Sequence, residues 1–300
     1  MKKYTIYQVD AFTRTKFKGN PAGVVVNADG LSEDQMQNIA RELNNSETAF
    51  LFRPDNSSCD GKIRYFTPTI EVPTCGHATV AAMVAKAVEE DLASCVLRFQ
   101  TKIGILPFEI ERSHDRIKIW MTQGDIKIDP PLSLEIQNRL MESLGISQKD
   151  LDNRCPVQIA STGHSKVMIG IASQEKLHSL SPDLHRLKEL SRTINCNGYF
   201  VFTLDMEDPD STSHGRMFAP AIGISEDPVT GNANGPLGAY LIHNKLAEPK
   251  QGSFFFKGVQ GEAMGREGVI EVLVFVQDGK PKLVKIAGEA VPIFRTVIEL

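Results

Sequence analysis

The segment 78–88 constrains the fold more than any other part of the chain. It reads Ala-Thr-Val-Ala-Ala-Met-Val-Ala-Lys-Ala-Val, so a helix formed there is apolar on nearly every side. Such a helix cannot lie on a surface, and it is far shorter than the roughly 20 residues that cross a bilayer. We therefore predict a helix that is enclosed by a sheet.

Short runs of alternating or β-branched residues supply strands for that sheet. The runs lie at residues 4–12, 24–26, 48–53, 62–67, 105–111, 116–121, 166–171, 199–204 and 269–276. Runs of this kind are typical of β-strands. The chain is therefore predicted to be rich in strands, with an α+β fold.

Three further helices are predicted to be peripheral. A capping box at Ser32 and Gln35 begins the first, which carries Met36, Ile39, Ala40 and Leu43 on one face. The second spans residues 133–144 and ends at Gly145, and the third follows 181–183 with Leu184 and Leu187 on its inner face. Residues 123–131, which end in two prolines, are predicted to be a linker because proline cannot continue a ladder or a helix.

Two parts of the chain resemble one another in the order of their motifs. Phe66-Thr67-Pro68 precedes Thr74-Cys75-Gly76-His77 and the apolar helix; Phe218-Ala219-Pro220 precedes Val229-Thr230-Gly231-Asn232 and a second helix of small residues at 235–246. Short matches of this kind also arise by chance, but the shared order favours a duplication. We predict two halves, one formed by residues 1–122 with a returning strand at about 290–300, the other by residues 123–289.

Composition excludes several classes of function. The net charge is −4 and no basic patch is present, which argues against nucleic-acid binding. No apolar stretch is long enough for a membrane span and the first ten residues alternate like a strand, so a cytoplasmic location is expected. The five cysteines are scattered, and His164, His178, His185 and His214 lack nearby ligand partners. We predict reduced thiols, surface or loop histidines, no metal site and no cofactor.

Two glycine-containing turns open predicted helices and are candidates for binding an anion. They are Cys75-Gly76-His77 and Thr230-Gly231-Asn232. The first backbone N–H groups of a helix have no intrahelical partner and carry the positive end of its dipole, which suits a carboxylate. Glu47, His77 and Asp227 lie beside turns or caps, where burial can adjust them for acid–base work. We expect these groups to meet in a cleft between the halves.

These strings together resemble the PhzF family, the phenazine-biosynthesis isomerases and their relatives with a diaminopimelate epimerase-like fold. The resemblance covers nearly the whole chain. The strings are Gly19-Asn20-Pro21-Ala22, Asn45-Ser46-Glu47-Thr48, Phe66-Thr67-Pro68, Cys75-Gly76-His77-Ala78, Arg216-Met217-Phe218 and Glu226-Asp227-Pro228 before Thr230-Gly231. One departure is Asn232 and Asn234, where relatives often carry Ser or Ala.

The resemblance implies the fold and the roles of the site residues. It implies two pseudo-symmetric halves, each a curled, mostly antiparallel sheet around a central helix, with residues 291–300 as a strand that returns to the first half. It implies that Glu47 is the general acid and base, that His77 and Asp227 assist, and that the turns frame a small carboxylate substrate. Asn20, Ser46, Cys75, Gly76, Thr230, Gly231 and Asn232 are the expected substrate-binding residues. A homodimer is the family expectation.

Two other functions remain open from the sequence. A two-base racemase or epimerase of the same fold would use two thiols, and Cys75 stands where the first belongs. Thr230 occupies the matching position of the second half, and its hydroxyl is too weak a base for that role. A protein that binds small molecules without turnover is the other alternative, because a fold does not fix a function.

Overall fold

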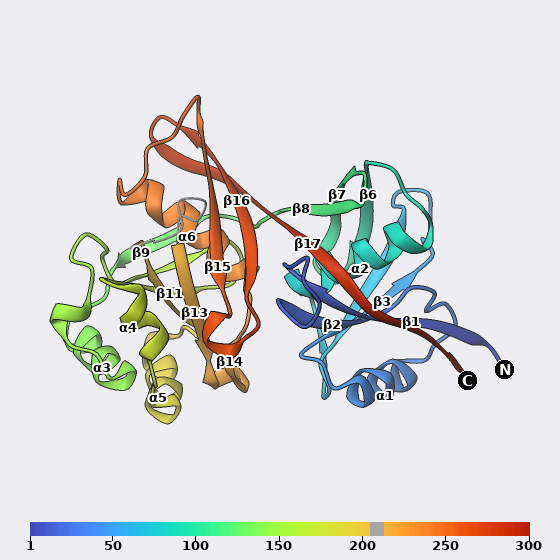
Figure 1. The fold of residues 1–300 in the computed structure, drawn as a ribbon, viewed down its shortest axis with the longest axis horizontal. Helices are drawn as coiled ribbons and strands as arrows, with labels where there is room; N and C mark the ends of the chain where they lie inside the picture. Colours follow the sequence, from blue (N-terminus) through green and yellow to red (C-terminus); the bar gives the residue numbers. More distant parts are fainter. Residues whose placement is uncertain (205–212) are drawn as a thin grey trace. The chain divides into compact units, whose positions relative to one another are not determined.

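The computed structural model describes residues 1–204 and 213–300, and it divides into two compact units. Unit 1 contains residues 1–121 and 287–300, and unit 2 contains residues 122–286. Figure 1 shows the mixture of strands and helices in each unit. None of the described helices is long and apolar enough to span a membrane.

Unit 1 is built on a mixed sheet. Its strands are β1 (Lys3–Ala11), β2 (Asn20–Val25), β3 (Thr48–Phe52), β4 (Gly61–Phe66), β5 (Glu71–Val72), β6 (Cys95–Thr101), β7 (Gly104–Ser113), β8 (Arg116–Thr122) and the last part of β17 (Lys280–Glu299). Neighbours pair antiparallel except β2 with β3 and β4 with β6, which are parallel. Because β17 pairs with both β1 and β8, the strands close into a ring.

Helix α2 (Gly76–Glu89) lies inside this ring, as the apolar segment predicts. Its side chains are buried at each position 77–85 and at Ala87, and it packs against β1, β2, β3 and β7. Only its last turn reaches the surface, where Val88 is 45% exposed. Small alanine side chains allow strands to approach the helix closely on several sides, which explains why the helix needs no polar face.

Helix α1 (Glu33–Leu43) covers the outer face of the same sheet. The predicted capping box is present: the Ser32 hydroxyl accepts from the Gln35 backbone N–H and the Gln35 side chain accepts from the Ser32 N–H. Met36 and Ile39 point into a cluster with strand residues such as Phe50. The chain leaves the helix at Asn44 in the left-handed conformation, with φ of 52°, and reaches Glu47 just before β3.

Unit 2 repeats the order of strand pairings. Its strands are β9 (Lys127–Pro131), β10 (Gln158–Ser161), β11 (Lys166–Ile171), β12 (Tyr199–Thr203), β13 (Ser213–Ala219), β14 (Ile224–Asp227), β15 (Ser253–Gln260) and β16 (Gly268–Gln277). Pairs β11–β12 and β13–β15 are parallel, while β12–β13, β13–β14 and β15–β16 are antiparallel. This is the sequence of parallel and antiparallel pairs found from β2 to β7.

Helix α6 (Gly231–His243) is the buried helix of unit 2. It is buried at nearly every position and packs against β10, β11, β15 and β16. Helices α3 (Leu134–Leu144), α4 (Gln174–Ser179) and α5 (Leu184–Ile194) contribute to a second core with residues of β11 and β12. The described part of unit 2 also contains the short 3-10 helices η1 (Gln148–Asp150), η2 (Pro220–Ile222) and η3 (Glu262–Met264).

The prediction of a linker without strand structure at 123–131 was wrong. Residues Lys127–Pro131 form β9, which pairs antiparallel with β10. The register shifts between Gln158 and Ala160, so Pro130 falls at an irregularity where the ladder does not require its missing N–H. Proline at a bulge or a strand end is compatible with a sheet, and the two prolines stand at the end of β9.

Candidate active site

Four of the predicted residues come together in unit 1. The imidazole of His77 has its Nε2 atom 3.2 Å from Ser46 Oγ and 3.3 Å from Glu47 Oε2. Its Nδ1 atom lies 3.4 Å from Cys75 Sγ. One ring therefore connects the hydroxyl and carboxylate of the 46–47 segment with the thiol at the start of α2.

Local structure explains this convergence. Glu47 ends the connection from α1 to β3, and its backbone carbonyl accepts from Gly23 N of β2. Cys75 is the N-cap of α2 but makes no side-chain capping bond, and His77 is in the first helical turn. Since α2 packs against both β2 and β3, its first turn comes beside the end of the 44–47 segment.

The site is partly shielded from water. The side chains of Glu47 and His77 are 17% and 8% exposed. A Cβ built on Gly76 would contact only Met121 Cε, at 3.9 Å, so the helix start is not crowded at this position. An accessible carboxylate beside an imidazole and an uncrowded helix start can remove a proton from a bound molecule and return it elsewhere.

The Thr79 side chain, one turn further along α2, stabilises the Cys75-Gly76-His77 turn. Its hydroxyl donates to the carbonyl of Cys75 at 2.7 Å and lies 2.6 Å from the hydroxyl of Tyr65. Tyr65 is fully enclosed, and burial raises its pKa. The pair is therefore neutral and fixes the turn without adding charge. This role could not be predicted from the sequence, because a threonine within an apolar helix is indistinguishable from a packing residue.

Glu47, Cys75 and His77, the first cluster, also have the side chains of a metal-binding set. One ligand atom from each of Glu47, Cys75 and His77 lies within 4.8 Å of the others, a carboxylate, thiol and imidazole set that suits zinc. The Cys75 thiol is within hydrogen-bonding distance of His77 Nδ1, and the Glu47 carboxylate lies 3.3 Å from His77 Nε2, so these contacts alone account for the placement of the three side chains. Chelation tests distinguish the two uses.

Asp227 and Thr230 come together in unit 2. Asp227 ends β14, Thr230 is the N-cap of α6, and the Thr230 hydroxyl donates to Asp227 Oδ2. Gly231 begins the helix and is buried, and Asn232 beside it is half-buried. Asn20, by contrast, lies buried in β2 of unit 1, opposite Ala11 of β1. The joint action of the residues of the two units on one substrate stays a prediction.

Gln260 forms hydrogen bonds with both Asp227 and Thr230, which we call the second cluster together with Asn234. The sequence did not predict its role. Its Nε2 donates to the Asp227 carbonyl at 2.7 Å and to Thr230 Oγ1 at 3.1 Å, while its Oε1 accepts from Thr230 N at 3.1 Å. Asn234 donates to the same Oε1 at 3.2 Å and to the Thr230 carbonyl at 3.1 Å. Asn234 therefore supports the turn, which gives a structural reason for an amide where relatives often carry a smaller residue.

Two charged side chains complete the surroundings of Asp227. Burial lowers the pKa of Lys166 on β11, and the carboxylate of Asp227 acts against that shift. Arg216 on β13 forms a bidentate ion pair with Glu226 at 2.9 and 2.8 Å, which ties β14 to β13 immediately before Asp227. Arg216 belongs to one of the strings that resemble the PhzF family, and the ion pair shows that it stabilises the pairing of β13 with β14.

His214 differs from prediction, whereas His164, His178 and His185 are exposed as predicted. His214, expected to be a surface or loop residue without partners, lies in β13, is 5% exposed, and has Nδ1 2.7 Å from Glu262 Oε2. His178 lies 3.1 Å from the same oxygen. The error arose because Glu262 is 48 residues from His214 in the sequence, so spacing could not reveal the contact.

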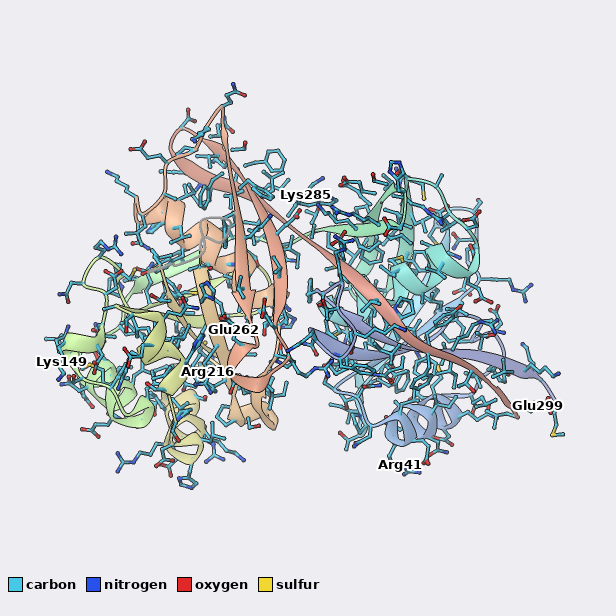
Figure 2. All side chains as sticks on the ribbon, in the orientation of Figure 1. Arg41, Lys149, Arg216, Glu262, Lys285 and Glu299 are labelled. Carbon is cyan, nitrogen blue, oxygen red and sulfur yellow. The ribbon has the colours of Figure 1, made fainter. Side chains whose placement is uncertain are left out.

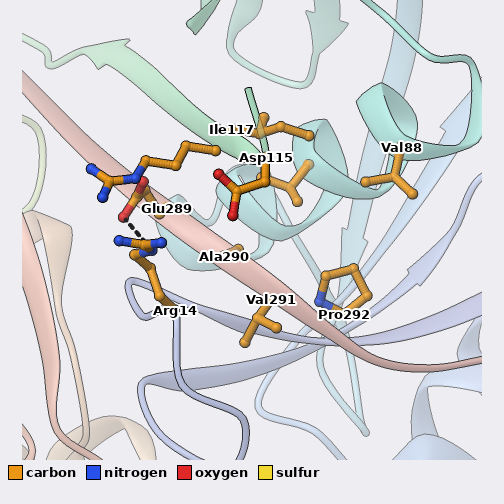
Figure 3. Close-up of a pocket in the computed structure, with 10 residues that line it drawn as sticks. Arg14, Val88, Asp115, Ile117, Glu289, Ala290, Val291 and Pro292 are labelled. Carbon is orange, nitrogen blue, oxygen red and sulfur yellow. Dashed lines mark ion pairs between the residues drawn. The ribbon is translucent and has the colours of Figure 1, made fainter. Parts of the chain in front are cut away.

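A separate pocket of about 210 Å³ lies elsewhere in unit 1. Figure 3 shows Arg14 and Glu289 at its edge, joined by an ion pair at 3.6 Å, with Val88, Asp115 and Pro292 around it. None of the predicted site residues lines this pocket. Arg116 and Asp115 also line it, so its charged lining comes from both signs.

The comparisons with known proteins identify the family. The family model described as "Phenazine biosynthesis-like protein" matches residues 9–296. The chain belongs to this family. An uncharacterized isomerase of Clostridium acetobutylicum is 53% identical over 300 residues, covering 100% of this chain and 99% of the relative. The trans-2,3-dihydro-3-hydroxyanthranilate isomerase of Pseudomonas chlororaphis is 32% identical and covers both chains completely.

Solved structures agree with this assignment. A phenazine biosynthesis protein of the PhzF family from Bacillus anthracis superposes with a TM-score of 0.89 at 30% identity, covering all of both chains. A hydroxyproline epimerase from Agrobacterium vitis shares only the fold, with a TM-score of 0.62 at 14% identity over 99% of this chain and 93% of the other. The predictions of an α+β fold shared with epimerases and of a PhzF-like isomerase are confirmed at this level.

Proposed function

We propose that the protein is an isomerase that transfers a proton within a small carboxylate substrate, without a cofactor, and that Glu47 is both the base and the acid. The observation that carries the proposal is the placement of the Glu47 carboxylate, 17% exposed and 3.3 Å from His77 Nε2, beside the start of α2. The relative that acts on trans-2,3-dihydro-3-hydroxyanthranilate supports a substrate of this class.

The proposed reaction uses one carboxylate twice. Glu47 accepts a proton from one carbon of the substrate, and the protonated carboxyl returns it to another carbon, so no proton is gained or lost overall. The backbone N–H groups at Gly76 and His77 bind the substrate carboxylate, because the first amides of α2 have no intrahelical acceptor. His77 and Ser46 hold Glu47 in place through the 3.3 Å and 3.2 Å contacts at His77 Nε2.

We propose further that Asp227 assists the same reaction and that the two units are pseudo-symmetric halves. The repeated order of strand pairings and the two buried helices support the second point. The network of Gln260 and Thr230 supports the first, since it fixes Asp227 at the start of α6. A double variant of Glu47 and Asp227 that loses no more activity than the worse single variant would indicate one shared step.

A two-base racemase is the second candidate, favoured by Cys75 Sγ at 3.4 Å from His77 Nδ1. An imidazole at this distance can accept the thiol proton and produce a nucleophilic or basic thiolate. The corresponding residue of unit 2 is Thr230, whose hydroxyl donates to Asp227. A hydroxyl with a pKa far above that of a thiol, committed to a carboxylate, is a poor second base.

The test compares Glu47→Gln with the wild type on trans-2,3-dihydro-3-hydroxyanthranilate and on a panel of amino acids. We expect the variant to lose at least ~10²-fold in kcat while its circular dichroism and melting temperature stay close to wild type. Glu42→Gln, an exposed glutamate of α1, is the matched control and keeps full activity. A Glu47→Gln variant with wild-type kcat contradicts the proposal.

A further inference from the structure

A second group of polar side chains converges in unit 2, apart from the hydrogen bonds of Asp227, Thr230 and Gln260. It consists of Gln174 and His178 on α4, His214 on β13 and Glu262 on η3. One ligand atom from each of His178, His214 and Glu262 lies within 4.8 Å of the other two. Figure 2 labels Glu262 among the strands of this unit.

The distances within this group are short. Glu262 Oε2 is 2.7 Å from His214 Nδ1 and 3.1 Å from His178 Nε2. The amide nitrogen of Gln174 is 3.2 Å from His214 Nδ1 and 3.5 Å from Glu262 Oε1. Four side chains from three separate elements therefore surround one point.

The framework that holds the group is well fixed. His214 stands opposite Val259 of β15, and the chain turns directly after β15 at Gly261. Gly261 has φ of 89°, and a Cβ there would come within 2.3 Å of the Arg266 carbonyl, so the turn to Glu262 requires glycine. The carbonyl of His178 accepts from Arg216 Nη1 at 3.3 Å, which holds the end of α4 in place.

Two buried atoms of the group have no hydrogen-bond partner among the described residues: Gln174 Oε1 and His214 Nε2. The orphaned amide oxygen is the more informative of the two. Rotation of the amide exchanges its oxygen and nitrogen, and the two are not distinguished by shape. Such a rotation would aim a ligand oxygen at the point shared by the two imidazoles and the carboxylate.

The donor set and the spacing suit a transition-metal ion. Two neutral imidazoles and a carboxylate are ligands typical of zinc, with an amide oxygen as a fourth. Metal–ligand distances of about 2.0–2.1 Å in a tetrahedron place neighbouring ligand atoms about 3.3 Å apart. The observed separations of 2.7, 3.1 and 3.2 Å need shifts of about 0.1–0.6 Å to reach that value.

We propose that Gln174, His178, His214 and Glu262 form a site for one divalent transition-metal ion of the zinc class, with a structural role. The ion clamps α4 to β13 and to the turn after β15. Four protein ligands leave no coordination position for a substrate, which is characteristic of a structural and not a catalytic site. The site does not depend on the proposed isomerase mechanism.

The test uses the full chain, stripped of metal with a chelator and dialysed, and titrated with Zn²⁺ or Co²⁺ in a calorimeter. We expect one equivalent to bind and the melting temperature to rise with the logarithm of the metal concentration. His178→Ala and Glu262→Gln should each weaken binding at least ~10-fold; His178 is 37% exposed and is the substitution least expected to disturb folding.

Two control variants make the result specific. His185→Ala removes a histidine that is 79% exposed on α5 and should bind metal like the wild type. Cys75→Ser weakens the other potential set, Glu47, Cys75 and His77, and should also leave binding unchanged. The proposal is overturned if the wild type binds no metal, if both His178→Ala and Glu262→Gln bind it unchanged, or if Cys75→Ser abolishes binding.

Discussion

Replacement of Gln260 by methionine tests the organisation of the second cluster. Gln260 is fully buried and its amide takes part in four hydrogen bonds, two with Thr230 and one each with Asp227 and Asn234. Methionine has a similar volume, so the change removes the hydrogen bonds and leaves little cavity. The effect on stability therefore reports the polar contacts.

The magnitude follows from the groups that lose a partner. Asn234 Nδ2 still donates to the Thr230 carbonyl, and the Thr230 hydroxyl still donates to Asp227. The Thr230 N–H and the Asp227 carbonyl each lose the bond that Gln260 supplies. At roughly 1–3 kcal/mol for the buried Thr230 N–H, and less for the carbonyl of the half-buried Asp227, the variant should lose about 3 kcal/mol of the free energy of unfolding. This is a large part of the ~5–15 kcal/mol of a typical domain.

Urea denaturation at neutral pH measures this loss as a lower midpoint. Gln277→Met, at the exposed end of β16, is the matched control and should change stability by less than ~0.5 kcal/mol. A Gln260→Met variant within about 1 kcal/mol of wild type would refute the reasoning, because it would mean that the buried amide is not needed to satisfy the turn before α6.

Three further predictions concern unit 1. Cys75→Ser should keep much of the isomerase activity, measured as kcat, whereas complete loss would favour the racemase mechanism. Thr79→Val should lower the free energy of unfolding by ~1–3 kcal/mol because it removes the partner of the buried Tyr65 hydroxyl, and Thr79→Ser should restore most of it. Burial raises the pKa of Glu71, but hydrogen bonds from Arg64 and Lys102 outweigh burial and hold the net pKa below its usual value. The stability from this lowered pKa is present above the unfolded value of about 4.3 and is lost as the pH falls through the folded value, so the deficit of Glu71→Gln in urea midpoint should shrink in acid; a deficit independent of pH would contradict this.

Elements governed by local sequence were predictable. The capping box at Ser32 and Gln35 identified α1, and the left-handed Gly145 identified the end of α3. The apolar segment identified α2 because no exposed helix can be apolar on all sides. In these cases the physical cause lies within one or two turns of the chain.

Strands that depend on distant partners were missed. β13 contains Ser213, His214, Gly215 and Arg216, which do not alternate in polarity, yet all four are buried. Gly215 is there because the Phe200 ring of β12 occupies its side-chain space, with a Cβ contact at 2.4 Å. His214 pairs with Glu262 through its Nδ1 atom, and Arg216 pairs with Glu226. Such pairings are formed only by the folded sheet.

In the candidate site, too, the residues in local motifs were predictable and those that depend on distant partners were not. The segments around Glu47 and His77 were found from motifs, and the structure places the two side chains in contact. Gln260, Thr79 and Lys166 carry no local signal, because an isolated amide, hydroxyl or amine at a strand or helix position fits many roles. Their partners come from other elements: Gln260 bonds to Asp227 and Thr230, the Thr79 hydroxyl contacts Tyr65 of β4, and Lys166 interacts with Asp227.

The most direct measurement for the central claim is solvent deuterium incorporation during turnover in D₂O, followed by mass spectrometry and NMR. If Glu47 removes a proton from one carbon and returns one to another, product formed by the wild type carries at most one deuterium, at the carbon that receives the proton. Glu47→Gln should form product and exchange substrate protons at least ~10²-fold more slowly than the wild type, while Glu42→Gln behaves as wild type. Deuterium at the same carbon in the Glu47→Gln variant, at the wild-type rate, would show that another group moves the proton and would contradict the account.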